Sequence, residues 1–274
     1  MIEALLAVLG IYLAIMVGMF AFQRKLLFFP DRTIPHPETS DVPEMSVAGY
    51  RTADNLALTS WFKSPPVKGA PVLVYFHGNA GHIGGRGSKV RPFLDAGFGV
   101  LLASYRGYGG NPGRPSEKGL LADGAAALAF LDGQGVDRSR IILYGESLGS
   151  GVAVALASRN RIGALVLEAP FTSAVDVGAA AYPWLPVRLA MRDKFDSLSR
   201  IADVSAPILV VHGELDRTVP IGFGRRLLAA APEPKEAHFF PFAGHTDLHE
   251  HGAVPVIMAF LARHDLGPGP GHSR

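Results

Sequence analysis

Short apolar runs alternate with alanine-rich or amphipathic stretches along most of the chain. Five runs are rich in Val, Ile and Leu, as in strands with both faces buried; they are residues 72–76, 100–103, 141–144, 165–167 and 208–211. The segments of helical character are residues 119–131, 148–158, 221–230 and 253–261. Residues 45–50 and 56–63 predict an antiparallel pair at the start. This alternation predicts an α/β fold with a mostly parallel, doubly wound sheet and right-handed crossovers.

The N-terminus follows a different pattern, because residues 4–22 contain neither a charge nor a proline. As a helix these 19 residues would span about 28 Å at roughly 1.5 Å per residue, close to the roughly 30 Å of a bilayer's hydrocarbon core. A cleaved signal peptide would need a basic start and a small-residue cleavage site. Glu3 precedes the run and Arg24 and Lys25 follow it, which favours an uncleaved transmembrane helix. These two charges weakly favour a cytoplasmic location for the rest of the chain, and the side of the membrane stays open.

The sequence divides into four segments. We expect a membrane anchor at residues 1–25, a juxtamembrane linker at 26–44, an α/β domain that carries the candidate catalytic residues at 45–264 and a flexible tail at 265–274. Residues 26–29 are apolar and either lie at the membrane interface or pack on the domain, while residues 30–43 are rich in proline and predict an extended connection. Residues 171–206 leave room for a small cap, whose apolar stretch at 182–191 either lines an acyl pocket or covers the sheet.

Composition narrows the function classes. With 48% hydrophobic and 18% charged residues, the chain is not a mainly disordered protein. It has no cysteine, which excludes disulfides, a thiolate nucleophile and cysteine-ligated metals. Its 26 basic and 24 acidic residues give a net charge of +2, and no Lys/Arg block occurs, so we do not expect a nucleic-acid partner.

A candidate nucleophile lies directly after the third apolar run. Gly145, Ser147 and Gly149 form Gly-x-Ser-x-Gly between a predicted strand and a small-residue helical segment, the context of a nucleophile elbow. A turn this tight leaves no room for Cβ atoms at the two glycine positions. An ordinary Gly/Ser turn is the competing interpretation, and the strand–turn–helix context argues against it.

A serine nucleophile needs a base and an acid that orients the base. His245 follows the strand-like residues 237–240, and Asp216 lies in the loop after the run at 208–211, with Glu214 as the alternative acid. The order nucleophile, acid, base is that of α/β-hydrolases. The acidic and histidine side chains at 245–251 lack a metal-ligand spacing, so we predict no metal, and no motif indicates a cofactor.

An oxyanion hole should complete such a site. One donor is expected from the backbone N–H of Leu148, the residue after the nucleophile. The other is expected from Asn79, in the Gly-rich loop that starts with His77 and Gly78 after the first apolar run. We assign His77, Gly78 and the two elbow glycines to loop support. A simple strand–helix turn is the alternative interpretation of this loop.

Together these residues resemble the α/β-hydrolase superfamily, and within it the membrane-anchored serine hydrolases related to eukaryotic α/β-hydrolase domain-containing depalmitoylases. The resemblance covers most of the chain and rests on the apolar N-terminus, Leu26-Leu27-Phe28-Phe29-Pro30, His77-Gly78-Asn79-Ala80-Gly81, Tyr105-Arg106-Gly107-Tyr108-Gly109, Pro115-Ser116-Glu117-Lys118-Gly119-Leu120, the elbow, Glu168-Ala169-Pro170-Phe171-Thr172-Ser173 and Gly244-His245. It implies an α/β-hydrolase fold with a small cap. It also matches Ser147, Asp216 and His245 to the family triad, and Asn79 and Leu148 to its oxyanion positions.

The sequence departs from the family pattern away from these positions. Ser104 replaces an Asp, His82 and Gly85 replace an Asn and a His, and Thr246 replaces an Asn. These changes weaken any substrate preference borrowed from a relative. Residues 105–109 are expected to support the loops under the site rather than to contact substrate.

The predicted function is a serine hydrolase that cleaves carboxylic esters or thioesters through an acyl-enzyme. A site beside a membrane favours acyl-chain substrates, either a small or lipid-like molecule or an acylated protein. A serine peptidase of the same fold is the alternative enzyme. A membrane-tethered scaffold without turnover is the alternative outside enzymes.

Overall fold

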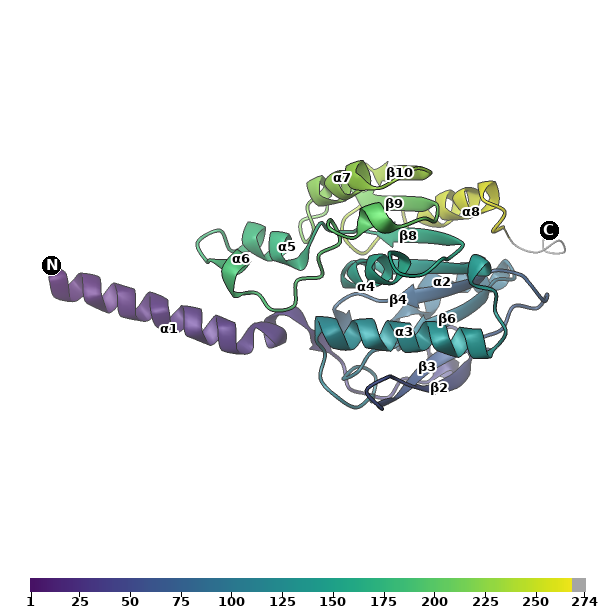
Figure 1. Cartoon of the computed structure of the whole chain (residues 1–274), viewed down its shortest axis with the longest axis horizontal. Helices are drawn as coiled ribbons and strands as arrows, with labels where there is room; N and C mark the ends of the chain where they lie inside the picture. Colours follow the sequence, from purple (N-terminus) through teal and green to yellow (C-terminus); the bar gives the residue numbers. More distant parts are fainter. Residues whose placement is uncertain (268–274) are drawn as a thin grey trace.

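An eight-stranded sheet forms the centre of the domain in the computed structural model, which describes residues 1–267 (Figure 1). Its strands, in order across the sheet, are β10 (Lys235–Phe240), β9 (Ile208–Gly213), β8 (Ala164–Glu168), β7 (Ile141–Glu146), β4 (Val72–Phe76), β6 (Gly99–Ala103), β3 (Ala57–Lys63) and β2 (Ser46–Arg51). The first six strands run parallel, whereas β3 is antiparallel to both β6 and β2. The predicted α/β architecture is confirmed.

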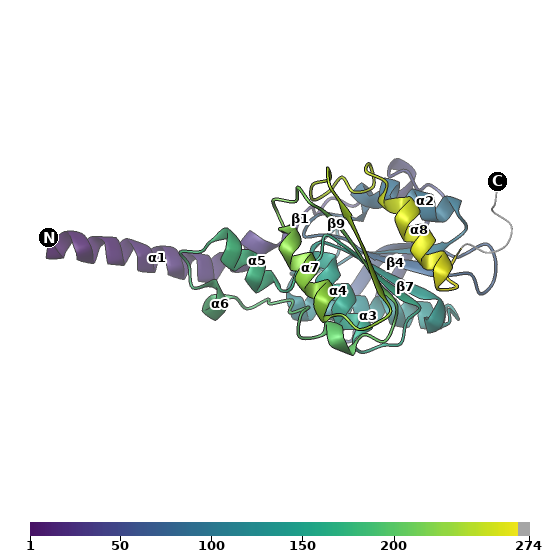
Figure 2. The same ribbon diagram turned by 90° about the horizontal axis from the view of Figure 1, so that it is seen from above.

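Five helices cover the two faces of this sheet, and two shorter ones, α5 (Ala174–Ala181) and α6 (Val187–Ala190), lie beside α1 (Figure 1). The five are α2 (Gly87–Asp95), α3 (Glu117–Gly133), α4 (Leu148–Ala157), α7 (Ile221–Ala230) and α8 (Ala253–Arg263). The helices α3, α4 and α7 pack on one face, and α2 and α8 on the other (Figure 2). A central strand needs apolar side chains on both of its faces, and strand β4 shows this. Its side chains alternate between the two cores: Val72, Val74 and Phe76 pack into one, and Leu73 and Tyr75 pack into the other.

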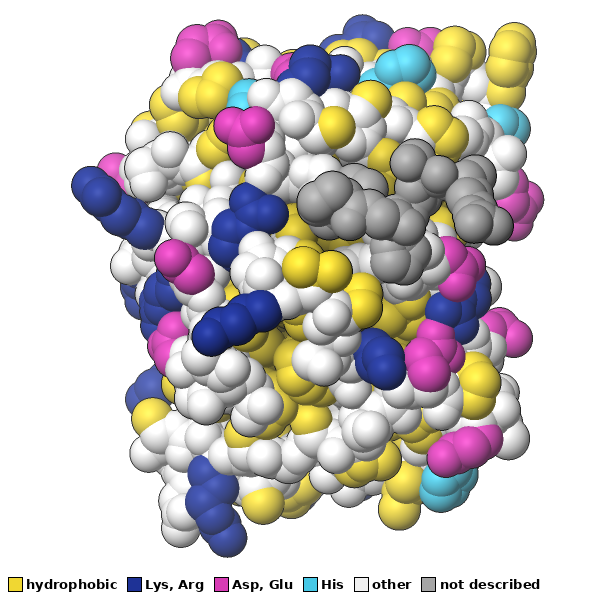
Figure 3. All heavy atoms as spheres, turned by 90° about the vertical axis from the view of Figure 1, so that its right-hand side faces the viewer, with side chains coloured by type: hydrophobic (Ala, Val, Ile, Leu, Met, Phe, Trp, Pro, Cys, Tyr) yellow, Lys and Arg dark blue, Asp and Glu magenta, His cyan; other side chains and the backbone are white. Residues whose placement is uncertain are grey.

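A long apolar helix precedes the domain and projects away from it. This helix, α1 (Ile2–Leu27), is long and apolar enough to span a membrane, and none of its residues is buried in the protein. It extends two residues beyond the predicted anchor, because the first helix-breaking residue is Pro30. The opposite end of the molecule carries scattered charges of both signs (Figure 3).

The predicted linker packs against the domain, which is one of the two alternatives for residues 26–29. Phe28 and Val42 are buried, and β1 (Phe29–Pro30) pairs in parallel with β5 (Ala80–Gly81) beside the sheet. At the other end, Leu266 is buried in the core under α8, so the packed domain extends two residues into the predicted tail. Residues 268–274 of that tail lie outside the described part of the chain.

Candidate active site

Ser147 lies at the carboxyl end of β7, where the chain turns sharply into α4. Its φ of 50° and ψ of −115° form a strained backbone conformation of the kind found at functional sites. A Cβ at Gly145 would lie 2.5 Å from the Cα of Ser150, and one at Gly149 would lie 2.0 Å from the carbonyl oxygen of Phe76. Both glycines are therefore required by close backbone contacts. The turn directs the Ser147 side chain into a cavity at the edge of the sheet.

The loops after β9 and β10 bring two more of the expected side chains to Ser147. Nε2 of His245 lies 2.9 Å from Oγ of Ser147, and the Nδ1–H of His245 donates to Oδ2 of Asp216 at 2.7 Å. The other oxygen of Asp216 accepts the backbone N–H groups of Thr218 and Val219, each at 2.8 Å. With its proton on Nδ1, the imidazole presents Nε2 as an acceptor to the serine hydroxyl.

Asp216 stays ionised in this setting. Burial raises its pKa, but hydrogen bonds from His212 and His245 lower it more, so the pKa lies well below its usual range. His212 is buried in β9, and its Nε2–H points between Oδ2 of Asp216, at 3.2 Å, and the carbonyl oxygen of Val219, at 2.8 Å. The structure therefore shows that His212 helps to hold the carboxylate of Asp216. Glu214, the alternative acid, is half-exposed and pairs with Arg225.

The N–H groups expected to form the oxyanion hole border the same cavity. Asn79 and Leu148 line it beside Ser147, and neither backbone N–H has a hydrogen-bond partner within residues 1–267. The side-chain amide of Asn79 donates to the backbone carbonyl of Leu27. The backbone carbonyl of Asn79 accepts from the N–H of Phe29 and from the hydroxyl of Tyr108. These bonds hold the loop in place and leave the backbone N–H of Asn79 without a partner among residues 1–267.

The segments expected to support this loop lie beneath it. His77 is buried against the rings of Tyr105 and Tyr108, and its Nδ1–H donates to the carbonyl of Gly78. Burial lowers the pKa of His77 to about 3. A Cβ at Gly78 would make only ordinary contacts, the shortest 3.5 Å to a glutamate oxygen. Tyr105 and Tyr108 are buried and do not line the cavity.

Buried ion pairs under the elbow were not expected from the sequence. Glu146, the residue before the nucleophile, accepts hydrogen bonds from Arg86 at 3.0 Å and from the hydroxyl of Tyr75 at 2.6 Å. Lys89 pairs at 2.6 Å with Glu168, whose backbone carbonyl accepts the N–H of Ser147. Charged residues at the ends of buried strands were the available signal. Their cationic partners come from η2 (Ile83–Arg86) and α2, which the apolar pattern does not predict.

The charges around Glu146 determine its ionisation. Burial raises its pKa, but the nearby Lys89 and Arg86 lower it more, and the net shift is downward. The other two histidines near the expected base have different partners. His249 contacts the hydroxyl of Tyr144, whereas His251 pairs with Asp247. The pKa of His249 is lowered because the imidazole is buried. These two histidines therefore do not converge on one site.

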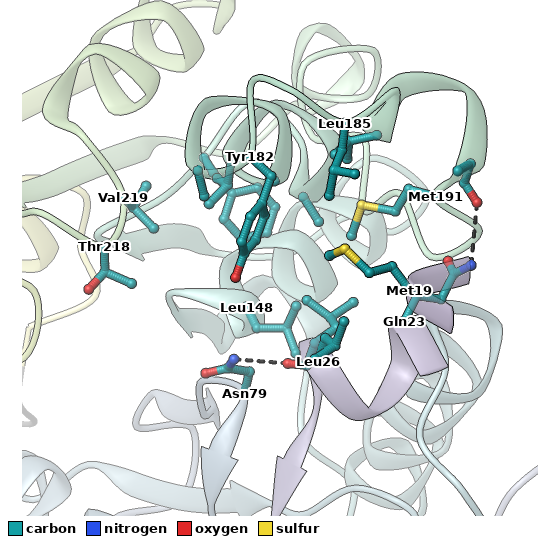
Figure 4. A pocket seen from close by; sticks show the side chains of 18 of the residues that line it. Met19, Gln23, Leu26, Asn79, Leu148, Tyr182, Leu185, Met191, Thr218 and Val219 are labelled. Carbon is teal, nitrogen blue, oxygen red and sulfur yellow. Dashed lines mark hydrogen bonds between the residues drawn. The ribbon is translucent and has the colours of Figure 1, made fainter. Parts of the chain in front are cut away.

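A cavity of about 470 Å³ extends from Ser147 between the cap, which is residues 174–191 with α5 and α6, and α1 (Figure 4). Its floor is Leu148, and side chains of Tyr182, Leu185 and Met191 point into it from the cap. Met19 reaches it from α1, so the apolar N-terminal helix forms one wall. The volume falls within the roughly 300–1,000 Å³ typical of small-molecule sites.

Comparisons with known proteins agree with this architecture. A family model for the α/β-hydrolase fold matches residues 71–200. The chain is 44% identical over 249 residues to a Mycobacterium tuberculosis protein, covering 88% of each. It is 31% identical to the α/β-hydrolase domain-containing protein WAV2 of Arabidopsis thaliana, covering 87% of this chain and 86% of that protein.

Among solved structures, the Pyrococcus furiosus esterase Pf2001 superimposes with a TM-score of 0.70 at 18% identity, covering 86% of this chain and 98% of that one. This likeness concerns the fold. The sequence relatives and the fold agree with the resemblance carried by the motifs, and the chain belongs to the α/β-hydrolase superfamily.

Proposed function

We propose that the protein is a serine hydrolase that cleaves carboxylic ester or thioester bonds of acyl-chain substrates. The observation that carries the proposal is the continuous hydrogen-bonded chain from Ser147 through His245 to Asp216. A hydroxyl is a weak nucleophile until a neighbouring base removes its proton, and this chain supplies the base and the group that orients it.

The reaction follows from the positions of these groups. Nε2 of His245 takes the Ser147 proton while Oγ attacks the acyl carbonyl, and the N–H groups of Asn79 and Leu148 stabilise the resulting oxyanion. The imidazolium returns the proton to the leaving alcohol or thiol, which leaves an acyl-enzyme. Water, activated by His245, then releases the acid. Asp216 stays ionised and stabilises the imidazolium throughout.

The apolar cavity supports an acyl chain as the part of the substrate that is bound. The side chains that face the cavity from the cap and from α1 are mainly apolar, and none of them is charged (Figure 4). Such a lining suits a hydrocarbon chain better than a polar substrate. We further propose that α1 is an uncleaved membrane anchor. Its length and composition support this, as does the packing of Phe28 into the domain directly after it.

The direct test is labelling with a fluorophosphonate probe, read by intact mass in membrane and soluble fractions. We expect one adduct on the wild type and none on Ser147→Ala. Ser158→Ala, at the far end of α4, is the matched control and should label like the wild type. A folded wild type without adduct would refute the hydrolase assignment. A labelled product lacking residues 1–25 in the soluble fraction would refute the anchor.

A further inference from the structure

The cap lies alongside the helix that we propose as the anchor (Figures 1 and 2). The hydroxyl of Tyr12 donates to the backbone carbonyl of Trp184 at 3.0 Å. Nearer the domain, the side-chain amide of Gln23 donates to the carbonyl of Ala190, and the guanidinium of Arg192 lies 4.3 Å from the ring centre of Phe20. The cap therefore follows α1 from residue 23 back to residue 12.

These contacts fix the depth of the cap relative to any membrane that α1 crosses. Tyr12 lies twelve residues before Arg24, which corresponds to about 18 Å along a helix. Apolar side chains between them are exposed, including Leu13, Val17 and Phe22. If the cap lay in water, this stretch would lie in water too, and only residues 2–11 would remain for the membrane. Ten residues are too few for the roughly 30 Å of hydrocarbon.

We propose that the cap, residues 174–191, is immersed in the bilayer leaflet beside α1, and that the cavity at Ser147 receives long acyl chains laterally from the membrane. This inference rests on the proposed anchor and hydrolase function, and it adds the location of the cap and the source of the substrate. The substrate class is a membrane lipid or lipid-modified molecule whose ester or thioester reaches the edge of the domain.

The surface chemistry of the cap fits hydrocarbon. Leu189 is 90% exposed and Trp184 is 55% exposed, although neither lines the cavity. In a bilayer, exposed backbone polar groups need internal partners, and the Tyr12 hydroxyl supplies one to the carbonyl of Trp184. The charge of Arg188 is paired with Asp176 at 2.7 Å, which reduces the cost of placing it near lipid.

The cavity reaches this immersed side. It begins at Ser147 and Leu148 and is bordered farther along by Met16 and Met19 of α1. A chain with its carbonyl at Ser147 would therefore extend along the membrane helix. Short, water-soluble esters would not need this part of the cavity.

Trp184 reports the depth of the cap directly. The chain has two tryptophans, and the other, Trp61, is 1% exposed in the core of the domain. The full chain is reconstituted in phosphatidylcholine vesicles with or without bromine on the acyl chains. We expect bromine to quench the wild-type emission and to leave Trp184→Phe, which keeps the backbone carbonyl, unaffected. Equal wild-type emission in the two kinds of vesicle would overturn the proposal.

A second experiment connects depth to activity. Leu189→Asp places a charge on the immersed surface, and Val67→Asp, at 44% exposure between β3 and β4, places one at the edge remote from the site. We expect Leu189→Asp to slow hydrolysis of a long-chain ester in vesicles by at least about tenfold, since hydrocarbon disfavours a charged aspartate. Its hydrolysis of p-nitrophenyl acetate should stay unchanged, and Val67→Asp should affect neither substrate.

The outcomes separate this proposal from the function on which it rests. Equal losses on both substrates, or no loss on either, would overturn the lateral route. Quenching of Trp184 in a protein that takes no fluorophosphonate would refute the hydrolase assignment while leaving the immersed cap in place. Labelling of Ser147 without quenching of Trp184 would refute the immersed cap and leave the hydrolase assignment in place.

Discussion

Replacing Asp216 by asparagine tests the proposed mechanism at a single atom. The carboxylate oxygen held by the N–H groups of Thr218 and Val219 must remain an oxygen, because an amide NH2 group cannot accept those bonds. The asparagine NH2 would then take the place of Oδ2 and donate to Nδ1 of His245. The imidazole would be forced to carry its proton on Nε2, facing Ser147, and could not act as a base.

The expected loss is large and specific. A wrong histidine tautomer of this kind costs about 10⁴-fold in kcat in a comparable Ser-His-Asp site, which corresponds to about 5 kcal/mol of transition-state stabilisation. The NH2 group would also face the Nε2–H of His212, so we expect a loss of about 1–3 kcal/mol in the free energy of unfolding.

The assay compares kcat on p-nitrophenyl acetate for folded wild type, Asp216→Asn and Glu214→Gln. Glu214 is two residues away and pairs with Arg225, so its amide should retain wild-type kcat. Activity of Asp216→Asn within tenfold of the wild type would refute the tautomer argument. A loss confined to Glu214→Gln would reassign the acid.

Three further predictions concern stability. Because the folded protein keeps His77 neutral down to a pKa of about 3 while the unfolded chain protonates it near 6.5, acid favours unfolding. Relative to His77→Gln, the wild type should lose about 1.4 kcal/mol per pH unit between pH 6 and 4 in urea titrations, and parallel pH curves would contradict this. Gly149→Ala should have a lower melting temperature than the wild type, because its Cβ would lie 2.0 Å from the carbonyl oxygen of Phe76 at the end of β4. Gly85→Ala, where a Cβ would have open space around it, should have the melting temperature of the wild type. Lys89→Met should lower the free energy of unfolding by about 3–5 kcal/mol because it leaves the buried Glu168 without its cation; an unchanged chemical denaturation midpoint would refute the importance of this pair.

The central strands were predictable because their sequence pattern reflects their surroundings. A strand buried on both faces needs an uninterrupted apolar run, and the five predicted runs became β4, β6, β7, β8 and β9. Helix α2 was not predictable in this way, since Gly87, Lys89 and Pro92 interrupt its apolar positions. A tertiary contact holds α2 near the site, because Lys89 pairs with Glu168, which lies 79 positions later in the sequence.

The link between the N-terminal helix and the site is likewise a tertiary feature, and it bears on the substrate. Asn79, whose N–H we assign to the oxyanion hole, is hydrogen-bonded to Leu27, the last residue of α1, and to Phe29, two residues later. A second contact joins α1 to the chain just after the cap, where Arg24 pairs with Asp193 at 2.7 Å. A flexible tether would keep the domain near a membrane without fixing its orientation. These two contacts instead fix the domain and its pocket relative to the helix. Such a fixed orientation offers no advantage for a soluble ester, but with α1 as the proposed anchor it would align the pocket with acyl chains in the leaflet. The packing around α1 therefore favours a substrate drawn from the membrane over one drawn from solution.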